Sequence, residues 1–137
     1  MYKYVSLIIL DIGLSIVPAY AAKHPTWTTS ECNAGKGGEI VEVGGESFCK
    51  ASATMNWWSA YSWCQGIGGR LPSIRELCPN VASMTQTASC GYQYPGNGPW
   101  SSTPVSAGSS SMWYLGFGNS LYTTGRNDKR VATCLKN

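Results

Sequence analysis

Histidine and charged residues are scarce in this sequence of 137 residues. It has a single histidine, His24, and only 12% of its residues are charged, with a formal net charge of +3. One histidine excludes a multi-histidine metal site, and a Ser-His-Asp triad would have to recruit His24 itself. No two cysteines have the C-x-x-C spacing, which argues against a redox motif or a zinc knuckle. The small, scattered positive charge argues against nucleic-acid binding.

A long uninterrupted apolar run, of the kind that spans a membrane, is also missing. The N-terminus instead has the pattern of an export signal, in which Lys3 precedes an apolar stretch that Asp11 interrupts. Ala19-Tyr20-Ala21 then has the small-x-small pattern that signal peptidase cleaves. A buried N-terminal helix is the alternative interpretation. We predict a signal peptide over residues 1–21 and one domain over residues 22–137, a length that suits a single domain.

Cysteine, in contrast, is plentiful. Six cysteines behind an export signal predict an oxidising compartment and three disulfides. Cys32 and Cys49 flank a predicted β-hairpin within residues 38–50. Cys78 and Cys90 flank the first part of a predicted loop region, residues 79–111. Six cysteines nevertheless allow fifteen connectivities, so the chain order alone leaves the pairing open. We expect the protein to be secreted or held at a bacterial cell surface, with the periplasm as the alternative compartment.

Local patterns predict a hairpin and one amphipathic helix in the first half of the mature chain. Residues 22–31 are expected to be an extended lead-in. Residues 38–43 and 46–50 predict two strands joined by a turn at Gly44-Gly45. Residues 54–65 predict a helix capped by Thr54. Its apolar positions recur at helical spacing, which predicts a core-facing stripe of Trp57, Ala60, Tyr61 and Cys64.

The second half is predicted to hold a short helix, long loops and a β-meander. Ser73 and Glu76 have the spacing of a capping box, which predicts a short helix that ends at Cys78. Residues 79–111 show no sustained period and are expected to be ordered loops anchored by Trp100. Three strands are then predicted at residues 112–117, 121–124 and 130–135, and the first, apolar on both faces, is expected to be central. The expected core residues are Trp57, Tyr61, Leu71, Leu77, Trp100, Trp113 and Leu115.

The order of these elements, together with four stretches of sequence, resembles the C-type-lectin-like superfamily. The stretches are residues 55–64 (MNWWSAYSWC), 69–77 (GRLPSIREL), 100–103 (WSST), and 113–117 with 131–134 (WYLGF and VATC). They are similar to a bacterial secreted branch related to the C-terminal domain of a collagen-like adhesin and to formylglycine-generating-enzyme-like domains. The resemblance covers residues 46–135.

The resemblance implies an α+β domain with the C-type-lectin-like fold. In this fold two short helices pack on a small antiparallel sheet with long loops, here with three disulfides. The resemblance also implies that Cys64 pairs with Cys134, which bridges the first helix to the last strand. With that pair set, Cys78 is expected to pair with Cys90, and Cys32 with Cys49.

This sequence lacks the residues that two activities of this superfamily need, namely calcium-dependent sugar binding and formylglycine generation. The calcium-dependent lectins use a Glu-Pro-Asn or Gln-Pro-Asp loop with a Trp-Asn-Asp strand, and this sequence has neither. Asp128 is the only acidic residue between Cys78 and Cys134. Formylglycine generation needs reactive cysteines and a metal ion, whereas all six cysteines here have an expected disulfide partner. Because residues 79–111 also offer no general base, we expect no metal, no cofactor and no catalysis.

A binding role remains. In the fold that the resemblance implies, the loops of residues 91–111 and the turns of residues 118–129 would cluster on one face. There Tyr and Asn with Ser and Gly would make an adaptable contact surface. The candidate ligand-binding residues are Tyr92, Tyr94, Asn97, Asn119, Tyr122, Arg126, Asn127, Asp128 and Lys129. Each of these residues has the alternative of being an ordinary solvated loop position.

The predicted function is therefore that of a secreted, calcium-independent binding module. It would recognise an extracellular or cell-surface ligand, either a glycan or a protein, through its long loops. Aromatic faces pack on sugar rings, and Arg126, Lys129 and Arg130 suit sulfates or carboxylates. The alternatives are a structural or assembly subunit of a bacterial surface appendage, which would self-associate, and a degenerate enzyme domain.

Overall fold

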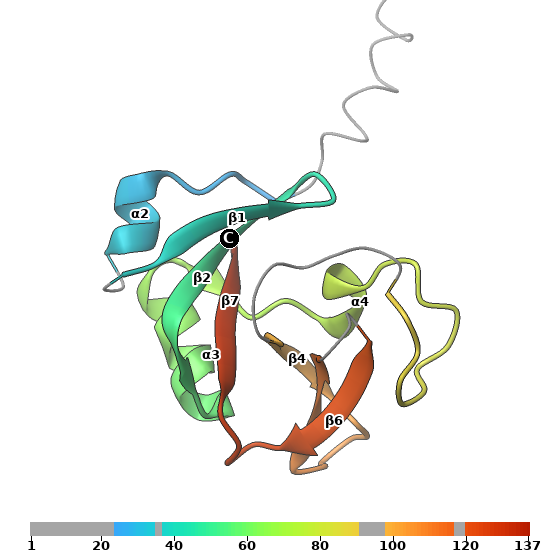
Figure 1. Cartoon of the computed structure of the whole chain (residues 1–137). Coiled ribbons are helices and arrows are strands. Elements are labelled where there is room, and N and C mark those ends of the chain that lie inside the picture. The colour runs from blue at the N-terminus through green and yellow to red at the C-terminus, as the bar shows by residue number, and fades with distance from the viewer. Residues whose placement is uncertain (1–23, 35–36, 91–97, 117–119) are drawn as a thin grey trace, which may run out of the picture.

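The computed structural model describes residues 24–34, 37–90, 98–116 and 120–137. Over these ranges the chain is an α+β structure with two small antiparallel sheets, three short helices and three disulfides (Figure 1). The strand order is β1-β2-β7-β3 in the first sheet and β4-β5-β6 in the second. The sequence predicted one sheet and two helices, so the second sheet and a third helix correct that expectation. The predicted signal peptide lies outside the described residues.

The predicted hairpin is present and consists of β1 (Glu39–Val43) and β2 (Glu46–Met55). Gly44 and Gly45 form its two-residue turn with φ values of +59° and +78°, the left-handed conformations that a type I′ turn requires. The second strand is longer than predicted, because its last residues pair with β7 (Arg130–Lys136). That pairing partner lies at the far end of the sequence, and no local pattern reveals it.

Two of the three described helices differ from the sequence prediction, since one was not predicted and another begins later than predicted. The lead-in contains a helix, α2 (Thr29–Asn33), because Thr28 and Glu31 form a complete capping box. The next helix, α3 (Trp57–Gly66), is capped by Asn56 and not by Thr54. Thr54 is still part of β2 and pairs with β7, so the helix can begin only after it. The third helix, α4 (Ile74–Leu77), has the predicted capping box of Ser73 and Glu76.

The remaining strands are β3 (Gly69–Arg70), β4 (Trp100–Pro104), β5 (Ser111–Leu115) and β6 (Leu121–Gly125). The predicted central position of the first C-terminal strand is confirmed, since β5 pairs with both β4 and β6. Its two faces are both covered, with Trp113 in one hydrophobic cluster and Met112 in the other. β4 lies within the region that the sequence predicted as loops.

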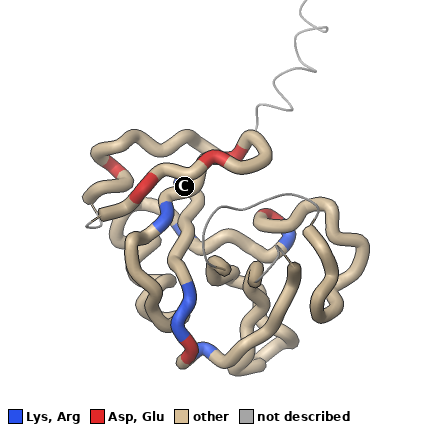
Figure 2. Tube along the Cα trace, in the orientation of Figure 1, with Lys and Arg blue, Asp and Glu red and all other residues tan. Residues whose placement is uncertain are grey.

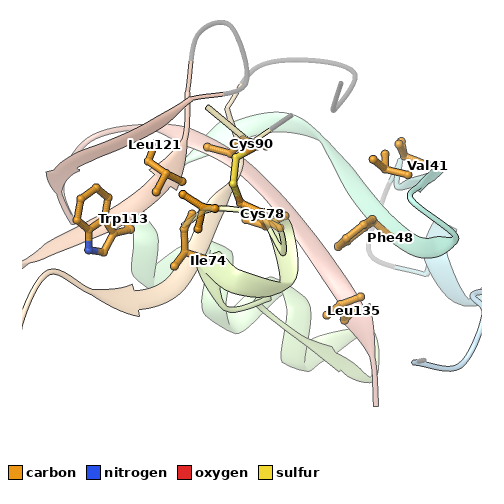
Figure 3. Close-up of a cluster of buried hydrophobic side chains, with 12 residues drawn as sticks. Val41, Phe48, Ile74, Cys78, Cys90, Trp113, Leu121 and Leu135 are labelled. Carbon is orange, nitrogen blue, oxygen red and sulfur yellow. A yellow bond between two sulfur atoms is a disulfide. The ribbon is translucent and has the colours of Figure 1, made fainter. Parts of the chain in front are cut away.

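The core consists of two hydrophobic clusters, each built around disulfides. One cluster contains Cys78–Cys90, against which Ile74 and Leu121 point (Figure 3). The other contains Cys32–Cys49 and Cys64–Cys134, and the second of these joins α3 to β7. All three pairs are those expected, and no cysteine of the described residues is free. Three disulfides are typical of proteins in oxidising compartments.

Most of the expected core residues are buried, with two exceptions. Leu71, Leu77, Trp100, Trp113 and Leu115 are each no more than 7% exposed. Trp57 is only partly buried, and Tyr61 is 40% exposed, so its predicted place in the core is wrong. The helix α3 is covered on one side only, where Ala60 and Cys64 face the sheet. None of the described helices has the length and apolar character of a membrane span.

A polar network joins the start of the described chain to α4. The Arg70 guanidinium donates to both carboxylate oxygens of Glu76, at 2.8 and 2.7 Å, and its Nη2 also contacts His24 Nε2 at 2.8 Å. The other ring nitrogen, His24 Nδ1, lies 3.2 Å from Glu46 Oε2, and Nε2 also lies 3.1 Å from Glu76 Oε2. Arg70 is thus a hydrogen-bond anchor between the start of the described chain and α4.

This network predicts a loss of stability in acid. The hydrogen bonds from Arg70 lower the pKa of Glu76 from 4.5 to about 2. Between pH 4.5 and about 2, Glu76 is protonated in the unfolded chain but still ionised in the folded protein. The stability that its ionised carboxylate provides above pH 4.5 is therefore lost as the pH falls towards 2. We expect this loss to be about 1–2 kcal/mol after allowance for solvent screening, measured by urea unfolding at pH 5 and pH 2.5. The variant Glu76→Gln should lack this component, and an unchanged pH dependence in that variant would contradict the assignment.

Candidate functional site

Three segments that are distant in sequence meet at one end of the molecule. They are the start of α3, the β4–β5 connection and the β6–β7 turn of residues 126–129 (Figure 1). Arg126 joins them through its backbone, because its carbonyl accepts from Trp57 N at 3.0 Å and its N–H donates to Ser110 O at 3.2 Å. The structure therefore brings the turn predicted as a binding loop against the helix predicted as core.

The Arg126 side chain lies on aromatic rings. Its guanidinium carbon is 4.7 Å from the ring centroid of Trp57 and 5.9 Å from that of Trp58. Both distances fall within the range of cation–π attraction. Its Nε also contacts the Met112 sulfur at 3.3 Å. Within the described part of the chain, no carboxylate forms an ion pair with Arg126, so this charge has no anionic partner there.

The α3 residues beside Arg126 expose aromatic surface to solvent. Trp58 is 48% exposed and Tyr61 is 40% exposed. Trp57 supports both, because its ring stacks on Tyr61 with centroids 5.3 Å apart and meets Trp58 edge-on at 6.3 Å. We call Trp57, Trp58, Tyr61 and Arg126 the aromatic platform. Val105, the other large apolar residue with high exposure in the described ranges, lies on the adjoining β4–β5 connection.

Polar groups without formal charge border the platform. Ser62 and Gln65 are exposed on the same face of α3 as Trp58 and Tyr61, because positions three and four apart share a helix face. The Gln65 amide donates to the Tyr61 hydroxyl at 3.1 Å. Asn127 is exposed in the neighbouring turn. The platform thus combines exposed aromatic rings and one cation with hydrogen-bonding side chains at its edge.

A second aromatic group packs on the β5–β6 pair and is mainly structural. Tyr122 is half-buried and stacks on Tyr114, with ring centroids 5.9 Å apart. The Arg130 guanidinium lies 4.4 Å from the Tyr114 ring centroid and donates to its hydroxyl at 3.2 Å. One ring face of Tyr122 is therefore covered, and its role as a contact residue stays a prediction.

Asp128 holds the β6–β7 turn in shape. Its carboxylate accepts from the Thr124 hydroxyl and the Lys129 N–H, each at 2.9 Å, and pairs with Arg130 at 2.7 Å. These hydrogen bonds, with the nearby Arg130 charge, lower the pKa of Asp128. Because Asp128 is committed to Arg130, it does not neutralise Arg126, and the turn carries a net positive charge.

Acidic residues outnumber basic ones at the end of the structure that holds α2 and the hairpin, and basic residues outnumber acidic ones at the β6–β7 turn. Figure 2 shows acidic positions on α2 and on the β1–β2 hairpin, away from the β6–β7 turn where basic positions gather. The acidic residues of those two elements are Glu31, Glu39, Glu42 and Glu46. This separation leaves the platform at the more positive end of the molecule.

The predicted site residues divide into three groups. Arg126, Asn127, Asp128 and Lys129 lie together in one turn, and the last three are exposed. Tyr122 lies apart from them on β6. The remaining predicted residues, Tyr92, Tyr94, Asn97 and Asn119, lie outside the described residues.

The sequence prediction did not include Trp58 and Tyr61 among the candidate site residues, and it placed Tyr61 in the core. A usable signal was present, because α3 carries aromatic residues at positions 57, 58, 61 and 63, and these point in too many directions for one core to cover. Trp58 and Tyr61 are three residues apart and lie on the solvent side, whereas Ala60 and Cys64 fill the buried side. The short buried residues thus define the core stripe, and the large ones lie outside it.

No metal centre or family assignment emerges for this site. Among the described residues, no group of three or more His, Cys, Asp or Glu side chains is arranged to hold a metal ion. A scan of protein-family models and a search of curated proteins found nothing that matches the chain.

Proposed function

We propose that this chain is a secreted, non-catalytic domain of the C-type-lectin-like type that binds an extracellular or cell-surface ligand without calcium. The binding surface is the aromatic platform with the adjoining turn of residues 126–129. One observation carries this proposal. Two half-exposed aromatic rings lie beside a guanidinium that has no carboxylate partner within the described residues.

The exposure of the platform supports a binding role because it leaves aromatic surface available to a ligand. A buried Trp or Tyr side chain removes about 150–250 Å² from water, so leaving Trp58 and Tyr61 half exposed forgoes part of that stabilisation. Contiguous exposed apolar surface with a polar border is typical of interaction sites. Trp57 and Arg126 also restrict the two rings, which lowers the entropy that a ligand must remove on binding.

The topology is compatible with the proposed superfamily. A hairpin is followed by a helix, a short helix, a loop region and a β-meander, in the order that the resemblance implies. The Cys64–Cys134 disulfide joins the first of those helices to the last strand, which is the pairing the resemblance implies. These two features support the superfamily assignment, which remains part of the proposal.

Two features support binding without calcium and without catalysis. The one carboxylate in the β6–β7 turn, that of Asp128, is engaged by Arg130, Thr124 and the Lys129 N–H, whereas calcium requires six to eight oxygen ligands. Both ring nitrogens of His24 contact charged side chains at the other end of the domain, so this histidine is not positioned beside a hydroxyl nucleophile.

We expect Trp58→Ala to weaken ligand binding at least tenfold while leaving the fold intact. The exposed ring contributes little to stability, so the free energy of unfolding should fall by no more than about 0.5–1 kcal/mol. Glycan and protein arrays, probed with and without EDTA, would identify ligands, and calorimetry would then compare the variant with wild type. Glu42→Gln, at the opposite end of the molecule, is the control. Binding that EDTA abolishes, or that Trp58→Ala leaves unchanged, would contradict the proposal.

The second candidate function is assembly with neighbouring subunits. Trp, Tyr and Arg are the residue types that dominate protein interfaces, and all three occur in the platform. In that case the isolated domain should self-associate as its concentration rises, and sedimentation velocity would show larger species that Trp58→Ala removes. A monomer at all concentrations, together with a ligand from the arrays, would favour the binding module.

A further inference from the structure

We propose that the aromatic platform binds a sugar ring that carries a carboxylate, such as a hexuronate unit. The apolar face of the ring would lie on Trp58, and its carboxylate would pair with Arg126. This inference rests on the proposed binding function and specifies the ligand class for the same site.

The size of the exposed apolar surface favours a small ligand. Trp58 and Tyr61 are 48% and 40% exposed, which leaves about 200 Å² of ring surface in contact with solvent, given the ~150–250 Å² that an aromatic side chain can bury. A stable protein interface buries about 800 Å² on each partner. The platform is therefore small for a stable protein partner but comparable to the faces of one or two sugar rings.

The charge at the platform selects an anion. Arg126 already lies over two indole rings and has no carboxylate partner within the described ranges. A cationic ligand would be repelled by this guanidinium. A carboxylate, in contrast, fits the two parallel N–H donors that a guanidinium presents. The acidic residues of α2 and of the β1–β2 hairpin lie at the other end of the molecule, so they do not repel an anion here (Figure 2).

The surroundings of the platform match a ligand rich in hydroxyl groups. The exposed side chains of Ser62, Gln65 and Asn127 and the Tyr61 hydroxyl can donate and accept hydrogen bonds. An extended peptide would instead need a sheet edge or a groove. The backbone of α3 is occupied by its own helical hydrogen bonds, so the helix offers only side chains to a ligand. Side chains alone are sufficient to recognise a sugar.

Calorimetric or NMR titration of the folded domain with defined trisaccharides tests the inference. The probes are trigalacturonate, a neutral galactose trisaccharide and a sulfated galactose trisaccharide. We expect wild type to bind trigalacturonate at least tenfold more tightly than the neutral sugar. Trp58→Ala should weaken the binding of trigalacturonate at least tenfold.

Two arginine variants separate local recognition from general attraction. Arg126→Gln should abolish the preference for the acidic sugar, whereas Arg75→Gln removes the same charge from exposed Arg75 on α4 and should preserve the preference. Because Arg126 also packs on Trp57, its substitution could destabilise the fold. The unfolding midpoint of each variant is therefore measured, to show that the variant is folded under the conditions of the titration. Arg126→Lys, which keeps the charge but loses the paired donors, provides the second comparison and should reduce the preference several-fold.

The outcomes distinguish this inference from the function on which it rests. Equal weakening by Arg75→Gln, or equal affinity for the neutral or the sulfated sugar, would overturn carboxylate recognition by Arg126. If none of the three trisaccharides binds but a protein on the array binds through Trp58, the ligand class is wrong and the binding function stands. If no ligand of any class depends on Trp58, both fail.

Discussion

The double variant Cys64→Ala/Cys134→Ala is expected to lose about 4 kcal/mol of stability, because the broken disulfide closes a loop of 70 residues. Both cysteines are fully buried where α3 packs on β7, so their removal also weakens that contact. A single domain has only about 5–15 kcal/mol of stability in total, and a loss of this size lowers the folded fraction sharply. Guanidinium unfolding with circular dichroism would measure it.

The comparison for this variant is Cys78→Ala/Cys90→Ala. That disulfide closes only 12 residues, for which the same chain-entropy relation gives about 3 kcal/mol. The variant without Cys64–Cys134 should therefore unfold at a lower denaturant concentration. The reverse order of the two midpoints would show that loop length does not set the contribution of these disulfides.

Trp100→Ala is expected to destabilise the domain by about 3–5 kcal/mol, the range for removal of a buried Trp side chain. Trp100 is fully buried, and its indole N–H donates to the Met55 carbonyl at 2.8 Å. It also meets Tyr114 edge-on, with ring centroids 6.5 Å apart. Through these contacts it ties β4 to the end of β2, so its loss opens a cavity between the two sheets.

Trp58→Ala is the matched control for Trp100→Ala, since it makes the same chemical change at an exposed position. We expect a loss of no more than about 0.5–1 kcal/mol there. Thermal unfolding of both variants gives the comparison directly. Similar losses in the two variants would show that the burial of Trp100 is not what stabilises the contact between the sheets.

Elements determined by neighbouring residues could be predicted from the sequence. The turn at Gly44-Gly45 requires two left-handed residues, and the capping box of Ser73 and Glu76 closes within four residues. The residues of β5 are apolar on both faces of the strand, and this pattern correctly predicted that β5 is central. In each case the stabilising groups are adjacent in the chain, so the pattern contains the information.

Elements determined by distant residues were predicted only in part. β2 runs on to Met55 because it pairs with β7, and α3 begins at Trp57 for the same reason. The helix α2 is an exception, because its capping box of Thr28 and Glu31 is local, yet the lead-in was predicted to be extended. The first two errors come from tertiary pairing, which no short window of sequence contains.

The candidate site shows the same division. Composition and turn patterns identified Arg126 and its neighbours as surface residues, and the turn does lie at the surface. The helical period placed Tyr61 in the core, because it shares a stripe with Ala60 and Cys64. Period alone does not say how wide a strip of a helix is covered, and here the sheet covers only the part around Ala60 and Cys64.

The sequence by itself determined the local elements, since the Gly44-Gly45 turn and the capping box of Ser73 and Glu76 are each formed by residues within a few positions of one another. The sequence also shows that acidic residues are scarce around the β6–β7 turn, where Asp128 is the only one between Cys78 and Cys134. Only the tertiary structure placed Arg126 on Trp57 and beside Trp58. Arg126 follows Trp57 by 69 positions and Trp58 by 68, and the two segments meet only when β7 pairs with β2. The platform exists because burial is decided by which surfaces the fold covers, and α3 is covered on one side alone.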